Sequence, residues 1–201
     1  MSSVAERLEA QRDSILDATA ELLLRDGAGG LRVNAIMSEA GVSRTAFYRR
    51  FRSAHDAVGA LLARLLAEIS TGAVDWMQDP GSVGDADIVE ANLVQSGRNL
   101  APHAELLCAI VDAAGSDGEL RRLWRDVVVQ ARIDATEAAI RRDQVAGAIR
   151  ASLDAADAAR ALTLMNSELA LEILGRRGGT AEEFARVTAP IWISVLFGAT
   201  D

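Results

Sequence analysis

The sequence predicts an all-α protein of about nine helices, three of them at the N-terminal end and the rest in a longer helical domain. Apolar side chains recur at helical spacing along most of the 201 residues. Ala and Leu are abundant and only 3 residues are Pro, a composition that favours helix throughout. No segment alternates Val, Ile, Thr and aromatic residues in the manner of a strand.

The first expected helix spans residues 4–26. Ile15, Ala18 and Leu22 form an apolar stripe on one face, while acidic residues occupy the other faces. Gly27, followed by two more glycines, interrupts this pattern. We therefore expect an amphipathic helix that ends at the glycine cluster.

Residues 33–52 predict two short helices joined by a tight corner. Gly41 breaks the apolar pattern of the first helix, because glycine readily takes the left-handed conformation that closes a helix. Ser43 is a candidate N-cap for the second helix. That helix places Phe47 and Phe51 on one face and polar side chains opposite. A short helix of this kind fits the major groove of DNA.

The charge distribution favours DNA binding at the same place. The net charge is −8, but residues 30–52 contain five Arg and a single acid, Glu39, and so carry +4. Nucleic-acid affinity depends on local neutralisation of phosphates rather than on the charge of the whole chain. The acidic remainder of the chain would repel DNA and help to orient its approach.

The segment AGVSRTAFYRRF, residues 40–51, resembles the helix-turn-helix signature of the TetR family of bacterial transcriptional regulators. The signature is specific, because the Ala-Gly-Val-Ser run and three aromatic residues must coincide at fixed offsets. The alternative is a helical hairpin in an ordinary bundle, which would not present three Arg and a Tyr together. The resemblance implies that the first helix packs over the helix-turn-helix.

Candidate DNA-binding side chains lie in and beside this motif. Arg44 and Thr45 are the candidates for base edges, whereas Tyr48 and Arg52 are expected mainly at phosphates. Arg32 stands where the family usually places a Thr or Ser cap. The complete predicted set is Arg32, Ser43, Arg44, Thr45, Tyr48, Arg49, Arg52 and His55.

A connecting helix is expected from about residue 54 to Trp76. Ser53 is its candidate N-cap, with Asp56 three residues on as in a capping box. His55 occupies a position where relatives commonly have a Lys that touches the DNA backbone. Residues 78–86 form a loop by composition. Further helices are expected at 87–100, 103–115, 119–146, 154–175 and 181–198.

We divide the chain into a helix-turn-helix DNA-binding domain at 1–53 and an effector-binding and dimerisation domain at 54–201. The helices at 154–175 and 181–198 are apolar almost all round, which suggests pairing in a homodimeric four-helix bundle. An ordinary monomer core is the alternative, and the family resemblance favours the dimer. Pro190 predicts a kink or a late start of the last helix.

A second resemblance concerns the C-terminal domain. LRRLW at 120–124, LTLMN at 162–166 and IWISVLFG at 191–198 resemble the TetR subgroup of the mycobacterial ethionamide-resistance repressor, which holds a largely apolar ligand channel. Plain core packing is the alternative for each matched residue, although a buried amide such as Asn166 needs a polar partner. The resemblance implies ligand contacts at Trp124, Val128, Ala131, Thr163, Asn166 and Trp192.

Other functional classes lack support in the sequence. The two histidines lie far apart, and no nucleophile, P-loop or zinc motif occurs, so we expect no enzyme activity, cofactor or metal. The single Cys108 excludes an internal disulfide, and no signal peptide or membrane-spanning run is evident, so a cytoplasmic protein is expected.

These observations predict a ligand-responsive DNA-binding regulator. We expect a homodimeric repressor that an apolar small molecule releases from a palindromic operator. The alternative is a helical protein–protein interaction module, or a co-regulator without effector binding.

Overall fold

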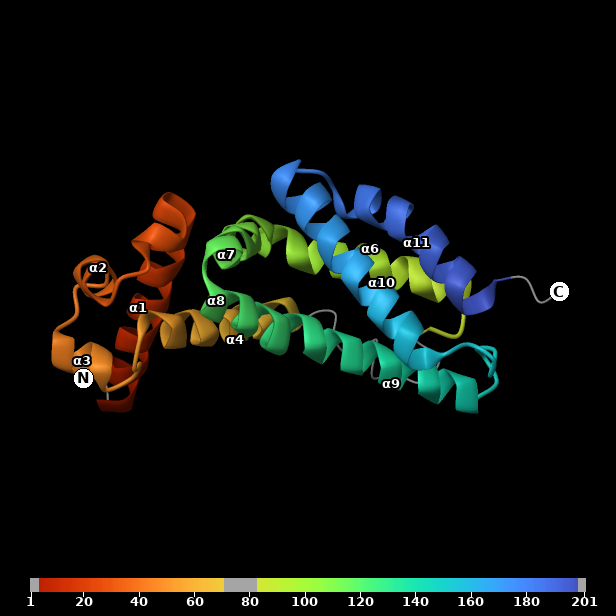
Figure 1. Ribbon diagram of the computed structural model, residues 1–201, viewed down its shortest axis with the longest axis horizontal. Helices are drawn as coiled ribbons and strands as arrows, with labels where there is room; N and C mark the ends of the chain where they lie inside the picture. The colour runs from red at the N-terminus through yellow and green to blue at the C-terminus, as the bar shows by residue number, and fades with distance from the viewer. Residues whose placement is uncertain (1–3, 71–82, 199–201) are drawn as a thin grey trace. The chain divides into compact units, whose positions relative to one another are not determined.

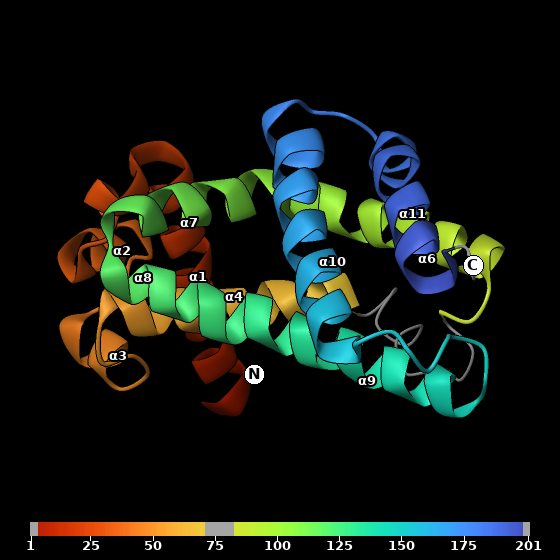
Figure 2. The same ribbon diagram turned by 45° about the vertical axis from the view of Figure 1, so that its right-hand side comes forward.

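The computed structural model describes residues 4–70 and 83–198, and within these ranges every regular element is a helix (Figures 1 and 2). The predicted all-α fold class is therefore confirmed. No helix in the described ranges is long and apolar enough to cross a membrane. The α-helices are α1 (Val4–Asp26), α2 (Val33–Glu39), α3 (Arg44–Tyr48), α4 (Ala54–Ser70), α6 (Ala86–Leu100), α7 (Ala104–Ser116), α8 (Gly118–Leu123), α9 (Ala131–Val145), α10 (Ala155–Ala170) and α11 (Ala181–Phe197).

Two of the predicted helices contain a π-helical segment. The predicted helix 119–146 consists of α8, a π-helix at Trp124–Gln130 and then α9. The predicted helix 154–175 consists of α10 followed by a π-helix at Leu171–Arg176. A π-helix bonds residues five apart instead of four, so it rotates the side chains that follow it relative to a regular helix. The expected connector beyond Ser70 and most of the expected loop lie outside the described residues.

The chain forms two compact units. The first comprises residues 1–65 with 108–127, and the second comprises residues 66–107 with 128–201. Helices α4 and α7 each contribute residues to both units. The functional boundary that the sequence suggests after residue 53 remains a prediction.

In the first unit, α1 packs against α2 (Figure 1). The two phenylalanines that follow the corner anchor α3. Phe47 is fully buried and Phe51 nearly so, with their ring centroids 5.9 Å apart. Gly41 has a φ of +64°, as its predicted role in closing α2 requires. The Ser43 hydroxyl accepts a hydrogen bond of 3.2 Å from the Ala46 amide, which confirms the predicted N-cap.

In the second unit, α11 packs on α6 and α10 packs on α9 (Figures 1 and 2). The approach of α6 to α11 is close, because a Cβ on Gly97 would lie 3.0 Å from the Ala181 Cα. Helix α11 begins at Ala181, where Thr180 and Glu183 form a capping box, and it continues through Pro190. Of the two outcomes expected from Pro190, a kink or a late start, the late start does not occur, because this cap begins the helix about two turns earlier.

Candidate functional site

Helix α3 presents a polar surface on the side opposite its buried phenylalanine. Arg44, Thr45, Tyr48 and Arg49 are all exposed, whereas Phe47 is 0 % exposed. The Ser43 cap fixes the start of this helix, and the phenylalanine fixes its rotation. The exposed side chains therefore project together from a rigidly placed turn of helix.

Arg44 and Tyr48 contact each other on this surface. The Arg44 guanidinium carbon lies 5.3 Å from the centre of the Tyr48 ring, within the range of a cation–π interaction. The Tyr48 ring in turn meets Phe47 edge to face, with centroids 5.4 Å apart. This stacking orders two exposed side chains while leaving their polar groups accessible to a ligand.

Three arginines of the predicted DNA-binding set are available to bind anions. No carboxylate of residues 4–70 or 83–198 pairs with the side chains of Arg32, Arg44 or Arg49, all of which are exposed. Arg52 is also exposed, with its Nε 3.7 Å from Asp56. The unpaired guanidinium groups make this end of the molecule a candidate nucleic-acid interface.

Arg50, by contrast, has a structural role. Its guanidinium donates two hydrogen bonds to the backbone carbonyl of Leu8 in α1, one of them at 3.2 Å. It therefore ties the helix-turn-helix to α1, and it contributes less to the interface than the local charge sum suggests.

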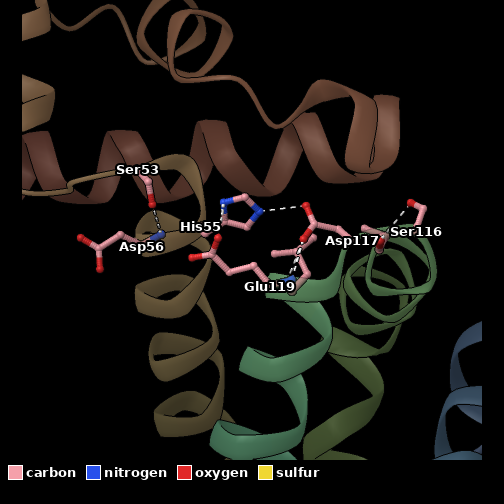
Figure 3. Close-up of polar contacts among 8 residues, drawn as sticks. Ser53, His55, Asp56, Ser116, Asp117 and Glu119 are labelled. Atoms are coloured by element: carbon pink, nitrogen blue, oxygen red, sulfur yellow. Dashed lines mark hydrogen bonds and ion pairs between the residues drawn. The ribbon is translucent and has the colours of Figure 1, made fainter.

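His55 lies between two carboxylates in the first turn of α4 (Figure 3). Its Nε2 is 2.8 Å from Asp117 Oδ2, and its Nδ1 is 3.4 Å from Glu119 Oε2. Asp117 is also the N-cap of α8, where it accepts hydrogen bonds from the amides of Glu119 and Leu120. The hydrogen bond from His55 holds the pKa of the Asp117 carboxyl below its usual value.

Both ring nitrogens of His55 are engaged, so neither is left to contact a phosphate. We therefore leave His55 out of the proposed DNA interface. The predicted cap beside it is present, because the Ser53 hydroxyl accepts a hydrogen bond of 3.1 Å from the Asp56 amide (Figure 3). The Asp56 carboxylate reaches back to the Arg52 amide at 2.9 Å.

Three of the predicted ligand-binding residues are buried and hydrogen-bonded inside the second unit. The Trp192 indole N–H donates a hydrogen bond of 3.0 Å to Asn166 Oδ1, and both residues are buried. The Thr163 hydroxyl donates to the Thr136 hydroxyl at 3.3 Å. The sequence analysis expected a polar partner for a buried amide at Asn166. The Trp192 indole is one such partner within the protein.

The remaining three candidates are not brought together as expected. Val128 is buried, Trp124 is half-buried in the first unit, and Ala131 is exposed. The expectation for Ala131 came from the family resemblance. Its neighbour Arg132 lies four residues after the buried Val128, which is the spacing of one helical turn, and it is half-buried.

Sequence reasoning missed Arg132, because the family resemblance pointed to its neighbour Ala131. The only signal in the sequence was a basic residue at helical spacing between apolar Val128 and the later buried positions.

Comparison with known protein families decides the classification. Residues 15–55 match the model described as bacterial regulatory proteins of the tetR family, and residues 92–198 match the C-terminal domain of the transcriptional regulator EthR. The chain belongs to the TetR family. A search of curated proteins found no match.

Solved structures of TetR-type regulators share the fold over nearly the whole chain. A Rhodococcus sp. protein described as a TetR-family transcriptional regulator is 22% identical, with a TM-score of 0.71 and coverage of 94% of this chain and 99% of its own. The fatty acid degradation regulator FadR from Bacillus halodurans is 18% identical, with a TM-score of 0.70 and coverage of 94% and 95%.

A third similar structure contains a ligand. The SmeT–triclosan complex is 18% identical, with a TM-score of 0.67 and coverage of 96% of this chain and 95% of its own. SmeT is the repressor of the Stenotrophomonas maltophilia multidrug efflux pump SmeDEF. At these identities the likeness shows the shared TetR fold.

Proposed function

We propose that this TetR-family protein is a homodimeric repressor that a small molecule releases from a palindromic operator. The observation that carries the proposal is the exposed polar face of α3, held outward by the buried Phe47 and by the Ser43 cap. Its dimensions and chemistry suit a recognition helix in the major groove.

The side chains of the proposed interface fall into two groups, those that would contact bases and those that would contact phosphates. Arg44 and Thr45, in the first turn of α3, are placed to read base edges, because guanidinium binds guanine bidentately and Thr contacts several bases. Tyr48, Arg49 and Arg52 would contact phosphates, which fix the register on the duplex without reading sequence. Arg32 and Ser43 complete the proposed interface.

Dimerisation through α10 and α11 is supported by the apolar side chains that these helices leave exposed. Leu164 on α10 is 47 % exposed and Ile191 on α11 is 42 % exposed, although both helices also contribute to the buried core. A two-fold dimer would present two copies of α3, which must match half-sites about 34 Å apart or a multiple of that spacing.

Effector binding is proposed for the second unit. The match to the EthR C-terminal domain and the triclosan complex of SmeT support a mainly apolar ligand and a place in the ethionamide-resistance-repressor subgroup. Helix α4 contributes residues to both compact units and directly follows the helix-turn-helix, so it is a covalent route by which a ligand would reorient α3. A hundredfold loss of operator affinity needs roughly 2.7 kcal/mol of preference for the released conformation.

The test is fluorescence anisotropy with duplex DNA from the region upstream of the protein's own gene, at a stated salt concentration. The double variant Tyr48→Ala/Arg49→Ala should abolish specific binding while preserving the helical circular dichroism and the dimer. Arg122→Ala is the matched control, because Arg122 is an exposed arginine on α8 and should bind as the wild type does. If the double variant bound the operator DNA with unchanged affinity, the proposed interface would be contradicted.

A further inference from the structure

One face of α9 and of the turn before it is buried in the second unit. Val128 is 6 % exposed, Thr136 is 1 % exposed, and Ala139 and Asp143 are covered as well. These positions follow each other at the spacing of one helical face. Arg132 lies on the same face, one turn after Val128 and one turn before Thr136, and it is half-buried.

The charge of Arg132 has no counterion in the part of the chain that the structure describes. No carboxylate or carbonyl of residues 4–70 and 83–198 pairs with its guanidinium. Burial lowers the pKa of Arg132, and no neighbouring acid offsets this effect. A guanidinium that loses part of its hydration without gaining a partner destabilises the folded protein.

The other charged residue on this face, Asp143, has hydrogen-bond partners within the protein. The Asp143 carboxylate is fully buried, but it accepts a hydrogen bond of 3.0 Å from Arg142 Nε and one of 3.1 Å from the Val83 amide. Among the described residues, the same unit therefore compensates Asp143 and gives Arg132 no counterion. This contrast leaves the Arg132 guanidinium able to pair with a bound ligand.

The surroundings of Arg132 show what kind of molecule that partner is. Next to it, Thr136 receives the Thr163 hydroxyl, and one turn from Thr163 the buried Asn166 receives the Trp192 indole. These polar groups satisfy one another, and the buried core around them is otherwise mainly apolar. The region thus offers one unpaired positive charge beside an apolar interior.

We propose that the effector of this protein is an apolar carboxylic acid whose carboxylate pairs with Arg132. A carboxylate matches the single charge and the planar, two-pronged donor set of guanidinium, and an alkyl or aryl body suits the apolar interior. The proposal rests on the proposed effector function of the second unit and specifies its chemistry.

The test measures binding of linear fatty acids from octanoate to hexadecanoate, each below its micelle concentration, with the matching 1-alkanols as uncharged probes. Isothermal titration calorimetry and thermal shift give the affinities for the full-length dimer. We expect at least one carboxylate to bind at least tenfold more tightly than its alcohol. In Arg132→Met the carboxylate should lose this advantage while the alcohol keeps its affinity.

Two controls separate a binding role from a folding effect. Arg141→Met removes an exposed arginine of α9, which pairs with Glu137, and should leave the carboxylate preference unchanged. Without ligand, Arg132→Met should have a Tm at or above that of the wild type, because it removes a half-buried charge that has no counterion among the described residues. A Tm well below the wild-type value would mean that Arg132 has an internal partner and would contradict the proposal.

The outcomes also distinguish this inference from the proposed function. An equal carboxylate advantage in wild type and Arg132→Met, or no binding of any acid in the series, would overturn the role of Arg132. Release of operator DNA by an alcohol but not by its acid would likewise overturn it, while leaving the ligand-released repressor intact. Failure of the wild type to bind any operator would instead contradict the proposed function itself.

Discussion

His55 Nε2 lies 2.8 Å from Asp117 Oδ2, which joins the first turn of α4 to the capped start of α8 (Figure 3). The two residues are 62 positions apart in the sequence but belong to the same compact unit as the helix-turn-helix. The contact therefore holds α4, the helix that follows the proposed recognition helix. Disrupting it should weaken DNA binding.

The pH dependence of stability tests the charge on Asp117. The folded-state pKa of Asp117 is lowered, mainly by its hydrogen bond with His55, so its carboxylate stabilises the fold above the unfolded pKa of about 3.8. This stabilisation should disappear as the pH falls through the lowered pKa. Asp117→Asn keeps an N-cap for α8 but removes the charge. Urea unfolding should show it less stable than wild type at pH 7, with the difference vanishing near pH 2.

Glu119→Gln is a useful comparison for this experiment, because Glu119 is 3.4 Å from His55 and has the more exposed side chain. Its effect on stability should be the smaller of the two. A constant difference between Asp117→Asn and wild type across the whole pH range would show that the charge plays no part.

Phe47 should be required for both stability and DNA binding. Because its ring is fully buried, Phe47→Ala is expected to lower the free energy of unfolding by about 3–5 kcal/mol. Tyr48→Ala, on the exposed face of the same helix, should change it by less than about 0.5 kcal/mol. Chemical denaturation of both variants checks this, and equal losses would mean that α3 is packed with a different face inward.

The Asn166–Trp192 hydrogen bond is expected to stabilise the second unit. Asn166→Ala would leave the buried indole N–H without its acceptor, which costs about 1–3 kcal/mol. Trp192→Phe removes the donor and retains much of the packing. A double-mutant cycle should give a favourable coupling between the two residues. Strictly additive effects would indicate that the contact contributes nothing to stability.

The proposed dimer interface makes a prediction about assembly. Leu164→Arg or Ile191→Arg would place a charge within an apolar interface, so each should convert the dimer into monomers in sedimentation experiments. Val145→Arg is the control, because Val145 is 91 % exposed but lies at the end of α9. A persistent dimer in both interface variants would place the two-fold contact elsewhere.

The sequence predicted the regular elements well, because their signals are local. The first helix was expected at residues 4–26 and spans Val4–Asp26, and the Ser43 cap and the Gly41 corner are present as expected. Apolar periodicity and capping residues act within a few positions of one another, so one sequence suffices to read them.

The details of both candidate sites were less accessible. The partner of His55 is distant in sequence, so no spacing rule could indicate that Asp117 would occupy its ring nitrogen. The π-helices at Trp124–Gln130 and Leu171–Arg176 also have no simple sequence pattern. Tertiary contacts and backbone irregularities therefore could not be predicted from local periodicity.

In vitro selection from a random duplex pool tests the central claim most directly. The wild-type protein should enrich a palindrome with two half-sites, and Arg44→Ala should relax the preference at one base pair in each half-site, at a cost of about 1–3 kcal/mol for that position. Failure to enrich any sequence, or an Arg44→Ala motif identical to that of wild type, would contradict the assignment of α3 as a recognition helix.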